Sequence, residues 1–318
     1  MPDCTSPSDH TARQAAAWQA SLTLGFADDG GTTRLFNNRH HGPLRVQKAL
    51  YPEDEKVCHA IVVHPPGGVV GGDQLAIDIG VGDRAHACIT TPGAAKWYQA
   101  NGKRSRQTVH LHVNQHAALE WLPQETIFFD TADVILDQHV ELALGATYIG
   151  CEILCMGRRG SGEVFNTGTV TQRSTIRREG KLLWWEQGAM LGGRLDSPLA
   201  LGGRTVCATL IAAGKALPAA QMNQLLADIR ADVAADSAAI SAANGAANGA
   251  ANAAANGSTG AAVNGGHVFG VTHTKGVLVA RHLGDDSETA RRLMLAVWRR
   301  VRPQLLEREA VTPRIWQT

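Results

Sequence analysis

Charge is scarce in this sequence of 318 residues, and no long basic run occurs in it. Asp, Glu, Lys and Arg together make up 19% of the chain, and the formal net charge is +1. Proteins that bind nucleic acid neutralise phosphates with clustered Lys and Arg side chains. The charge balance therefore argues against nucleic acid as the main partner, although it leaves room for a local basic patch.

A secretory signal and a long apolar run are also missing. Residues 1–16 are polar, and their basic residues are not followed by an apolar core, so we expect a disordered N-terminus rather than a signal. The most apolar later run, 208–220, is interrupted by Lys215 and Pro218 and is too short to span a bilayer. We expect no membrane partner.

The common catalytic motifs are absent as well. The chain has no G-x-x-x-x-G-K-[ST], H-E-x-x-H or G-x-S-x-G, so neither nucleotide hydrolysis nor a common hydrolase mechanism is indicated. Six cysteines stand at irregular spacing without paired C-x-x-C motifs. This usage is typical of reduced thiols and predicts a cytoplasmic protein.

Glycine, by contrast, is plentiful, with 34 residues, and four of them lie in the loop HPPGGVVGGD at 64–73. Residues 57–63 before it and 75–80 after it alternate in a strand pattern. A phosphate-binding loop needs a helix N-terminus behind it, and no helix pattern follows here. We therefore interpret the loop as a backbone bend that only glycine can adopt.

Most of the remaining chain reads as β-structure, and helices are expected only in the last third. A hairpin is predicted between residues 17 and 38, and a helix after Pro218. Asp285 and Glu288 form a capping-box pattern for a second helix with an apolar stripe. Residues 241–266 are almost entirely Ala, Asn and Gly, which predicts a mobile low-complexity insertion.

Two features resemble metal or acid–base sites. His110 and His112 share one face of a predicted strand, where two imidazoles could chelate nickel, zinc or copper. Glu120 and Glu125 flank a proline corner shortly afterwards, and paired carboxylates serve glycosidases or cation paths. A polar strand face and a charged strand edge are the structural alternatives for these two groups.

Several blocks then resemble one known family. GPLRVQKALYPE, HPPGGVVGGD, TTPGAAKWY, LEWLPQETIFF and GRRGSGEVF follow one another in the order found in the urease accessory protein UreD (UreH) family, and the ending PRIWQT is similar too. The resemblance implies a mainly β fold of stacked, two-layer β-helix-like sheets with a few α-helices in the C-terminal third. It also implies a single domain over residues 17–318 that carries the 241–266 insertion.

The resemblance further implies a chaperone of metallocentre assembly in nitrogen metabolism, with no catalytic activity of its own. Members join UreF and the GTPase UreG and dock on apo-urease for nickel insertion, without a permanently bound cofactor but with transient nickel possible. A homodimer within this accessory complex is a further possibility. Positions carried over by motif, for partner contact or structure, are Gln47, Lys48, Tyr51, Glu53, His64, Gly67, Gly68, Asp73, Lys96, Tyr98, Gln124, Arg158 and Glu163.

The most specific prediction is a path along which nickel could pass through the protein. His110, His112, Glu120 and Glu125 are its candidate residues, because imidazole and carboxylate donors suit nickel. Two alternatives remain open at the level of sequence. One is a β-helical carbohydrate-active enzyme that uses Glu120 and Glu125, and the other is a stand-alone metal-binding protein built on the two histidines.

Overall fold

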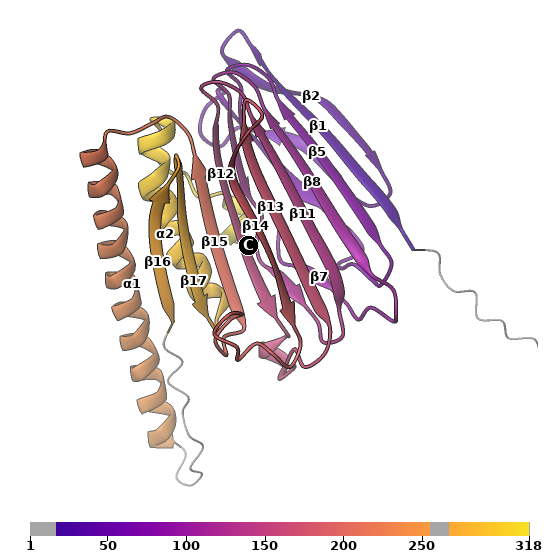
Figure 1. Ribbon diagram of the computed structural model, residues 1–318, viewed down its shortest axis with the longest axis vertical. Helices are drawn as coiled ribbons and strands as arrows, with labels where there is room; N and C mark the ends of the chain where they lie inside the picture. The colour runs from indigo at the N-terminus through magenta and orange to yellow at the C-terminus, as the bar shows by residue number, and fades with distance from the viewer. Residues whose placement is uncertain (1–16, 255–266, 318) are drawn as a thin grey trace, which may run out of the picture.

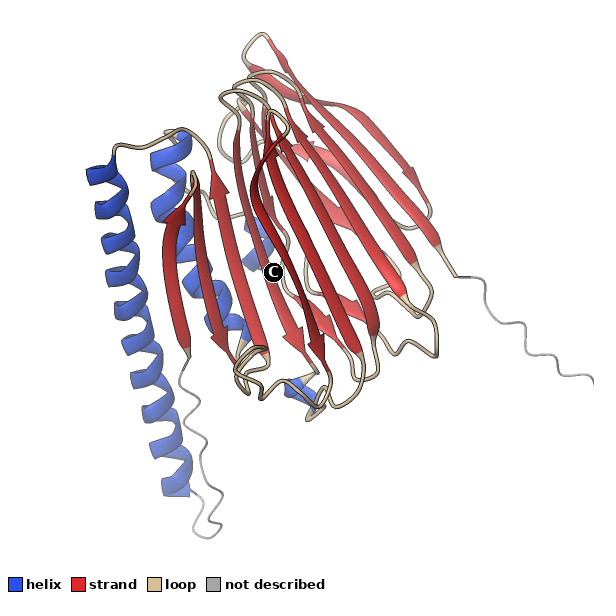
Figure 2. Ribbon diagram, viewed as in Figure 1, coloured by secondary structure: helices blue, strands red, loops and turns tan. Residues whose placement is uncertain are grey.

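The computed structural model describes residues 17–254 and 267–317, which form two facing β-sheets with two long helices packed on one of them (Figures 1 and 2). The first sheet has seven strands. Their order across the sheet is β14 (Lys181–Leu191), β13 (Thr169–Arg178), β11 (Asp133–Leu142), β8 (Ser105–Val113), β5 (Gln74–Val81), β1 (Gln19–Asp29) and β2 (Thr32–His41). We call it the seven-stranded sheet.

The second, ten-stranded sheet carries the helices. Its main path runs β16 (Val268–Thr274), β17 (Val277–Gly284), β15 (Val206–Ala213), β12 (Thr147–Met156), β9 (Ala118–Leu122), β6 (His86–Thr90), β4 (Val57–Val63) and β3 (Arg45–Leu50). Two short strands, β7 (Ala95–Trp97) and β10 (Thr126–Phe128), pair with each other beside β12.

The chain alternates between the two sheets from β4 to β13. β4, β6, β9 and β12 lie in the ten-stranded sheet, while β5, β8, β11 and β13 lie in the other. Successive strands within each sheet are parallel because the chain crosses to the opposite layer between them. This arrangement of stacked two-layer coils confirms the fold class predicted from the sequence.

Alternation along the strands builds the core between the layers. Leu75, Ile77 and Ile79 of β5 are buried, as the period-two pattern predicts, and they pack with inward-facing residues of the opposite sheet. The hairpin of β1 and β2 also forms as expected, around the turn at Gly30 and Gly31. The mostly apolar interior thus holds the two sheets together.

A second apolar core lies between the ten-stranded sheet and the helices α1 (Ala219–Ala254) and α2 (Ser287–Leu306). The predicted stripe of α2 is buried there, and the stripe consists of Ala290, Leu293, Val297, Trp298 and Val301. Two short 3-10 helices, η1 (Arg159–Ser161) and η2 (Arg314–Gln317), complete the described elements. No described helix is both long and apolar enough to cross a membrane.

Two helix ends differ from the sequence-based prediction. The N-cap of α2 is Asp286, whose carboxylate accepts a hydrogen bond from the Thr289 amide at 2.7 Å. Asp285 instead accepts a hydrogen bond from the Thr205 hydroxyl and forms an ion pair with Arg159, so its carboxylate does not cap the helix. The capping-box position was therefore wrong by one residue, because these partners come from distant parts of the chain.

Helix α1 continues to Ala254, and so includes the first part of the run at 241–266 for which we predicted a mobile insertion. Alanine has the highest helix propensity, which favours continuation of a helix through this alanine-rich stretch. The rest of that run, 255–266, and the N-terminal segment 1–16 lie outside the described residues.

Candidate functional site

The glycine-rich loop between β4 and β5 lies against β7. The Val69 amide donates to the Lys96 carbonyl at 2.8 Å, and the Tyr98 amide donates to the Val69 carbonyl at the same distance. Gly67 and Gly72 have φ angles of +78° and +97°, which L side chains rarely adopt. These values support the interpretation of the loop as a glycine-dependent bend.

Other glycines in the loop are needed for space. A Cβ on Gly68 would collide with the Tyr98 ring, and one on Gly71 would collide with the carbonyl of Ala100. Asp73 closes the loop, because its carboxylate accepts from the amides of Trp18 at 2.8 Å and Val70 at 3.1 Å. The motif carboxylate Asp73 therefore has a structural task.

A stack of side chains extends from this loop across neighbouring coils. Tyr98 meets Phe129 edge to face with 4.7 Å between ring centroids, and the Arg158 guanidinium lies 4.2 Å from the Phe129 centroid. Arg158 also donates to Glu163 at 2.8 Å. Tyr98, Arg158 and Glu163, which the sequence could only group by motif, thus form one set of contacts.

A cavity of about 300 Å³ opens between the sheets beside the loop. His64 reaches it with an Nε2 atom that is buried and has no hydrogen-bond partner among the described residues. Burial lowers the pKa of His64, and the nearby charge of Asp73 only partly offsets this effect. Other polar or motif residues in the lining are Gly67, Gly68, Lys96, Gln107, Gln124 and Glu152.

Glu152 lines this cavity and also a smaller one of about 20 Å³ between the sheets. Its carboxylate accepts a hydrogen bond from Gln172, and the pair formed by Glu186 and Arg281 lies close by. Burial, together with the negative charge of Glu186, raises the pKa of Glu152 to about 7. Gln138 and Tyr148 also line the smaller cavity.

Sequence reasoning missed this interior group. Glu152 and Gln172 stand at inward-facing positions of β12 and β13, where the neighbouring positions of the same parity are mainly apolar or small. A polar side chain at the buried phase of a strand was the available signal. The alternation along a strand predicts which face of the sheet a side chain occupies, but it does not predict which residues of the opposite sheet the side chain contacts.

A different group of polar residues is enclosed between the ten-stranded sheet and α2. Glu120, with no exposed surface, accepts hydrogen bonds from Trp298 Nε1 at 2.7 Å and Arg302 Nε at 3.0 Å, and it bonds with His86 Nε2 at 2.8 Å. Arg302 Nη2 also donates to the two carboxylate oxygens of Glu53, at 2.7 and 2.9 Å. We call Glu53, His59, His86, Glu120, Trp298 and Arg302 the α2 ion network.

Partners determine the charge state in this network. Burial alone would raise the pKa of Glu120, but the hydrogen bond and charge of His86, the charge of Arg302 and the bond from Trp298 together lower it to about 2. The pKa of Glu53 is lowered in the same way, against burial, by His59 and Arg302. Both carboxylates are therefore ionised and bound to a guanidinium that fastens α2.

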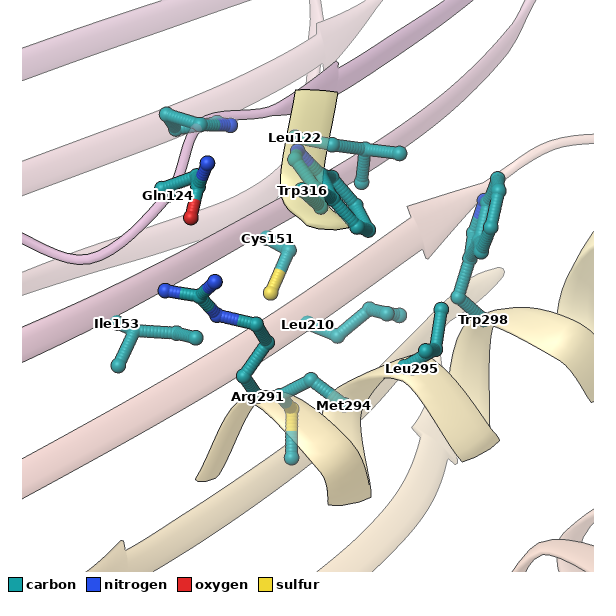
Figure 3. A pocket seen from close by; sticks show the side chains of 11 residues that line it. Leu122, Gln124, Cys151, Ile153, Leu210, Arg291, Met294, Leu295, Trp298 and Trp316 are labelled. Carbon is teal, nitrogen blue, oxygen red and sulfur yellow. The ribbon is translucent and has the colours of Figure 1, made fainter. Parts of the chain in front are cut away.

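A small pocket of about 30 Å³ lies beside the network, between β12, α2 and η2 (Figure 3). Trp316 and Trp298 pack there with centroids 6.3 Å apart, and Trp316 Nε1 donates to Thr90 Oγ1 at 2.7 Å. Arg291 extends from α2 toward the corner that carries Gln124, and it pairs with Glu125. The C-terminal segment thus covers this corner.

The two candidate histidines lie elsewhere. His110 and His112 are on the outer face of the seven-stranded sheet, opposite the buried Val109 and Leu111, which confirms the predicted alternation. His110 stacks on His139 with 4.9 Å between ring centroids. Among the described residues, no three His, Cys, Asp or Glu side chains come close enough to hold a metal ion.

The structure does not bring these histidines together with Glu120 and Glu125. β8 belongs to the seven-stranded sheet, whereas β9 belongs to the other, so strands adjacent in sequence lie in different layers. Glu120 is enclosed under α2 and Glu125 is held by Arg291. A glycoside could not reach Glu120 without displacement of the helix, so no observation favours the carbohydrate-active alternative.

The remaining motif residues lie at β3 and just after it. Gln47 and Lys48 are exposed on this edge strand, where a β-bulge interrupts the predicted alternation. The Tyr51 hydroxyl donates to the Thr33 carbonyl at 2.9 Å, and Glu53 then enters the α2 ion network. Only the last of these reaches an enclosed polar site.

Comparison with known proteins gives a consistent result. The model of a family described as UreD urease accessory protein matches residues 19–317. "Urease accessory protein UreD" of Janthinobacterium sp. (strain Marseille) is 53% identical, with 100% of this chain and 99% of the relative covered. The protein of the same name from Nitrosospira multiformis is 46% identical, with 94% and 98% covered. "Urease accessory protein UreD 2" of Pseudomonas syringae pv. tomato is 41% identical, with 97% and 98% covered.

Proposed function

Because this chain belongs to the UreD family of urease accessory proteins, we propose that it is a non-catalytic urease maturation factor of the cytoplasm. In this proposal it joins UreF and UreG and docks the assembly on apo-urease, so that nickel enters the urease active site. Nickel is then a transient cargo rather than a resident cofactor. The match over nearly the whole chain to proteins named urease accessory protein UreD is the observation that supports a role in urease maturation.

We propose Glu152 as a contact for nickel in transit. It is a carboxylate without a directly bound cation among the described residues, and it faces both interior cavities. A divalent cation beside it would offset the cost of burying its negative charge. Carboxylate, amide and imidazole groups, such as Glu152, Gln107 and His64, are weak ligands that can release the ion again.

The sequence-based candidates are less suited to exchange. At Glu120 and Glu125 a nickel ion would have to displace the guanidinium of Arg302 or Arg291. His110 and His112 are accessible on the outer face, where they could contribute to capture from solvent. We therefore propose that the nickel path passes Glu152. The two histidines are tested separately, as possible sites of nickel capture on the outer face.

The experiment is co-expression of the chain with UreF, UreG and apo-urease, followed by co-purification and nickel analysis of the urease. We expect Glu152→Gln to leave the complex intact and to lower nickel content and activity several-fold, because the neutral amide holds a cation more weakly. Glu179→Gln, in the exposed turn between β13 and β14 and away from both candidate regions, is the control.

The double variant His110→Ala with His112→Ala tests nickel capture on the outer face in the same assay. Normal nickel loading in the Glu152 variant would refute the interior path. Failure of the parent chain to co-purify with UreF and UreG would instead refute the scaffold role, so the two parts of the proposal fail separately.

A further inference from the structure

A separate cavity of about 160 Å³ lies where β13, α1, α2 and the β16–β17 turn meet. Its floor is apolar and consists of Leu217, Met222, Leu225, Leu278, Val301 and Leu305. An engineered cavity of about 150 Å³ holds a benzene molecule. The space therefore fits an apolar group of roughly six carbons and is too small for a nucleotide.

The charged groups in the lining are all cationic or imidazole groups. Arg178, Lys215, His273 and Lys275 line the cavity, and its described lining contains no Asp or Glu. Within the described part of the chain, the only acidic residue in an ion pair with them is Glu307, which binds Lys215 at 2.6 Å with 80% of its side chain exposed. This charge distribution favours an anionic ligand.

Arg178 is the most informative of these residues. Its Nη1 and Nη2 atoms donate to the carbonyls of Gly214 and Ala146, each at 3.0 Å. Its Nε atom is buried without a hydrogen-bond partner, and no carboxylate pairs with its charge among residues 17–254 and 267–317. An orphaned donor on an uncompensated guanidinium calls for an acceptor that carries negative charge.

The start of α1 adds to this field. Met222 and Leu225 of its first turns line the cavity, and the first turn carries no acidic side chain. The N-terminal end of a helix carries partial positive charge, which stabilises a nearby anion. The helix, the arginine and the rim cations thus act in the same direction above an apolar floor.

We propose that this cavity, the Arg178 pocket, binds a small monoanionic carboxylate whose apolar group occupies the floor. The carboxylate lies toward Arg178 and the rim, and the apolar group contacts Met222, Leu225 and Leu278. A free aliphatic acid and the last residue of a peptide with an apolar side chain both have this chemistry. The site is independent of the proposed role in urease maturation.

Calorimetric titration of the full chain with hexanoate tests the proposal, with 1-hexanol and hexanamide as uncharged probes. We expect hexanoate to bind at least about tenfold more tightly than either, because only the acid compensates the guanidinium. Equal binding of hexanol would show an apolar cavity without anion recognition and would overturn the proposal.

Two variants of adjacent residues form the matched comparison. Arg178→Gln should weaken hexanoate binding roughly tenfold or more, whereas Arg177→Gln, at the outward-facing neighbour, should not change it. Unchanged binding in the Arg178 variant would contradict the assignment.

Rim variants keep the test decisive if Arg178→Gln does not fold. Lys275→Gln should weaken binding a few-fold, and Glu307→Gln should tighten it by freeing Lys215 from its ion pair. Absence of both shifts would refute the site. A short peptide ending in leucine, with a free or an amidated C-terminus, then distinguishes the two sources: tighter binding than hexanoate by the free form alone identifies a chain end, and weaker binding identifies a free acid.

Discussion

Glu120 is fully buried and Glu152 lines the cavities between the sheets, yet their pKa values move in opposite directions, to about 2 and about 7. Burial opposes ionisation in both. Glu120 receives hydrogen bonds from Arg302, Trp298 and His86, which outweigh that cost. Glu152 accepts a hydrogen bond from the Gln172 amide and lies near a second carboxylate, Glu186, so its partners do not outweigh the cost of burial. Burial acts in the same direction on both carboxylates, so the difference between their pKa values comes from their partners.

The two environments suit different tasks. In the α2 ion network each carboxylate is fixed by a guanidinium, so the network anchors a helix to the ten-stranded sheet. In the interior cavity no described Lys or Arg forms an ion pair with the Glu152 carboxylate, which lines the open space. An anchor requires partners that stay in place, whereas passage of an ion requires a ligand that can exchange.

The largest expected effect tests the anchor. Arg302→Met should lower the free energy of unfolding by about 3–5 kcal/mol, because it leaves Glu53 and Glu120 buried without their cation. Urea denaturation at neutral pH is the measurement. Arg300→Met removes an ion pair with Asp232 on the surface and should cost below about 1 kcal/mol. Equal losses in both variants would abolish the distinction between the network and an ordinary surface pair.

The second prediction concerns the pH dependence of Glu152. Its pKa in the folded state is raised from the ordinary value of 4.5 to about 7, so the folded protein loses stability from this group as pH rises from 4.5 through 7. Glu152→Gln should therefore unfold like the parent near pH 4.5 but be more stable at pH 8, by roughly 1–3 kcal/mol. Thermal denaturation at several pH values measures this difference.

For Glu120→Gln we expect the opposite change in stability with pH. Its pKa is lowered in the folded state, so its contribution is present above 4.5 and is lost as pH falls toward 2. This variant should be less stable than the parent at pH 8. A variant of Glu152 that is also less stable at pH 8 would show that the two carboxylates do not differ in the proposed way.

A smaller effect is expected where the C-terminal segment covers the α2 face. Trp316→Phe removes the hydrogen bond to Thr90 but keeps an aromatic ring beside Trp298. The loss should be about 0.5–1.5 kcal/mol, the usual net value of one such bond. Chemical denaturation measures it, and an unchanged midpoint would mean that the segment adds little to the anchoring of α2.

The smallest effect is expected outside both regions. His110→Ala with His112→Ala alters an outer sheet face, so the free energy of unfolding should change by less than about 0.5 kcal/mol per site. The same double variant serves the nickel assay. A large loss of stability would show that the stack of His110 on His139 supports the seven-stranded sheet.

The local structure and the family could both be predicted from the order of the amino acids. Alternation of apolar residues predicted β5 and β8, the spacing of the α2 stripe predicted its buried face, and the ordered motif blocks indicated UreD. These predictions held because strand and helix periodicity depend on near neighbours in the chain. The glycine loop was equally readable, because positive φ angles restrict the residue type.

The contacts between polar residues, by contrast, depend on how distant parts of the chain pack together. Arg302 reaches Glu120 and Glu53 across 182 and 249 positions of sequence, and no local pattern records such a pairing. His110 and Glu120 are close in sequence, but the coil sends their strands into opposite sheets. Periodicity gives the side of a strand that a residue occupies, whereas the stacking of coils determines what it faces there.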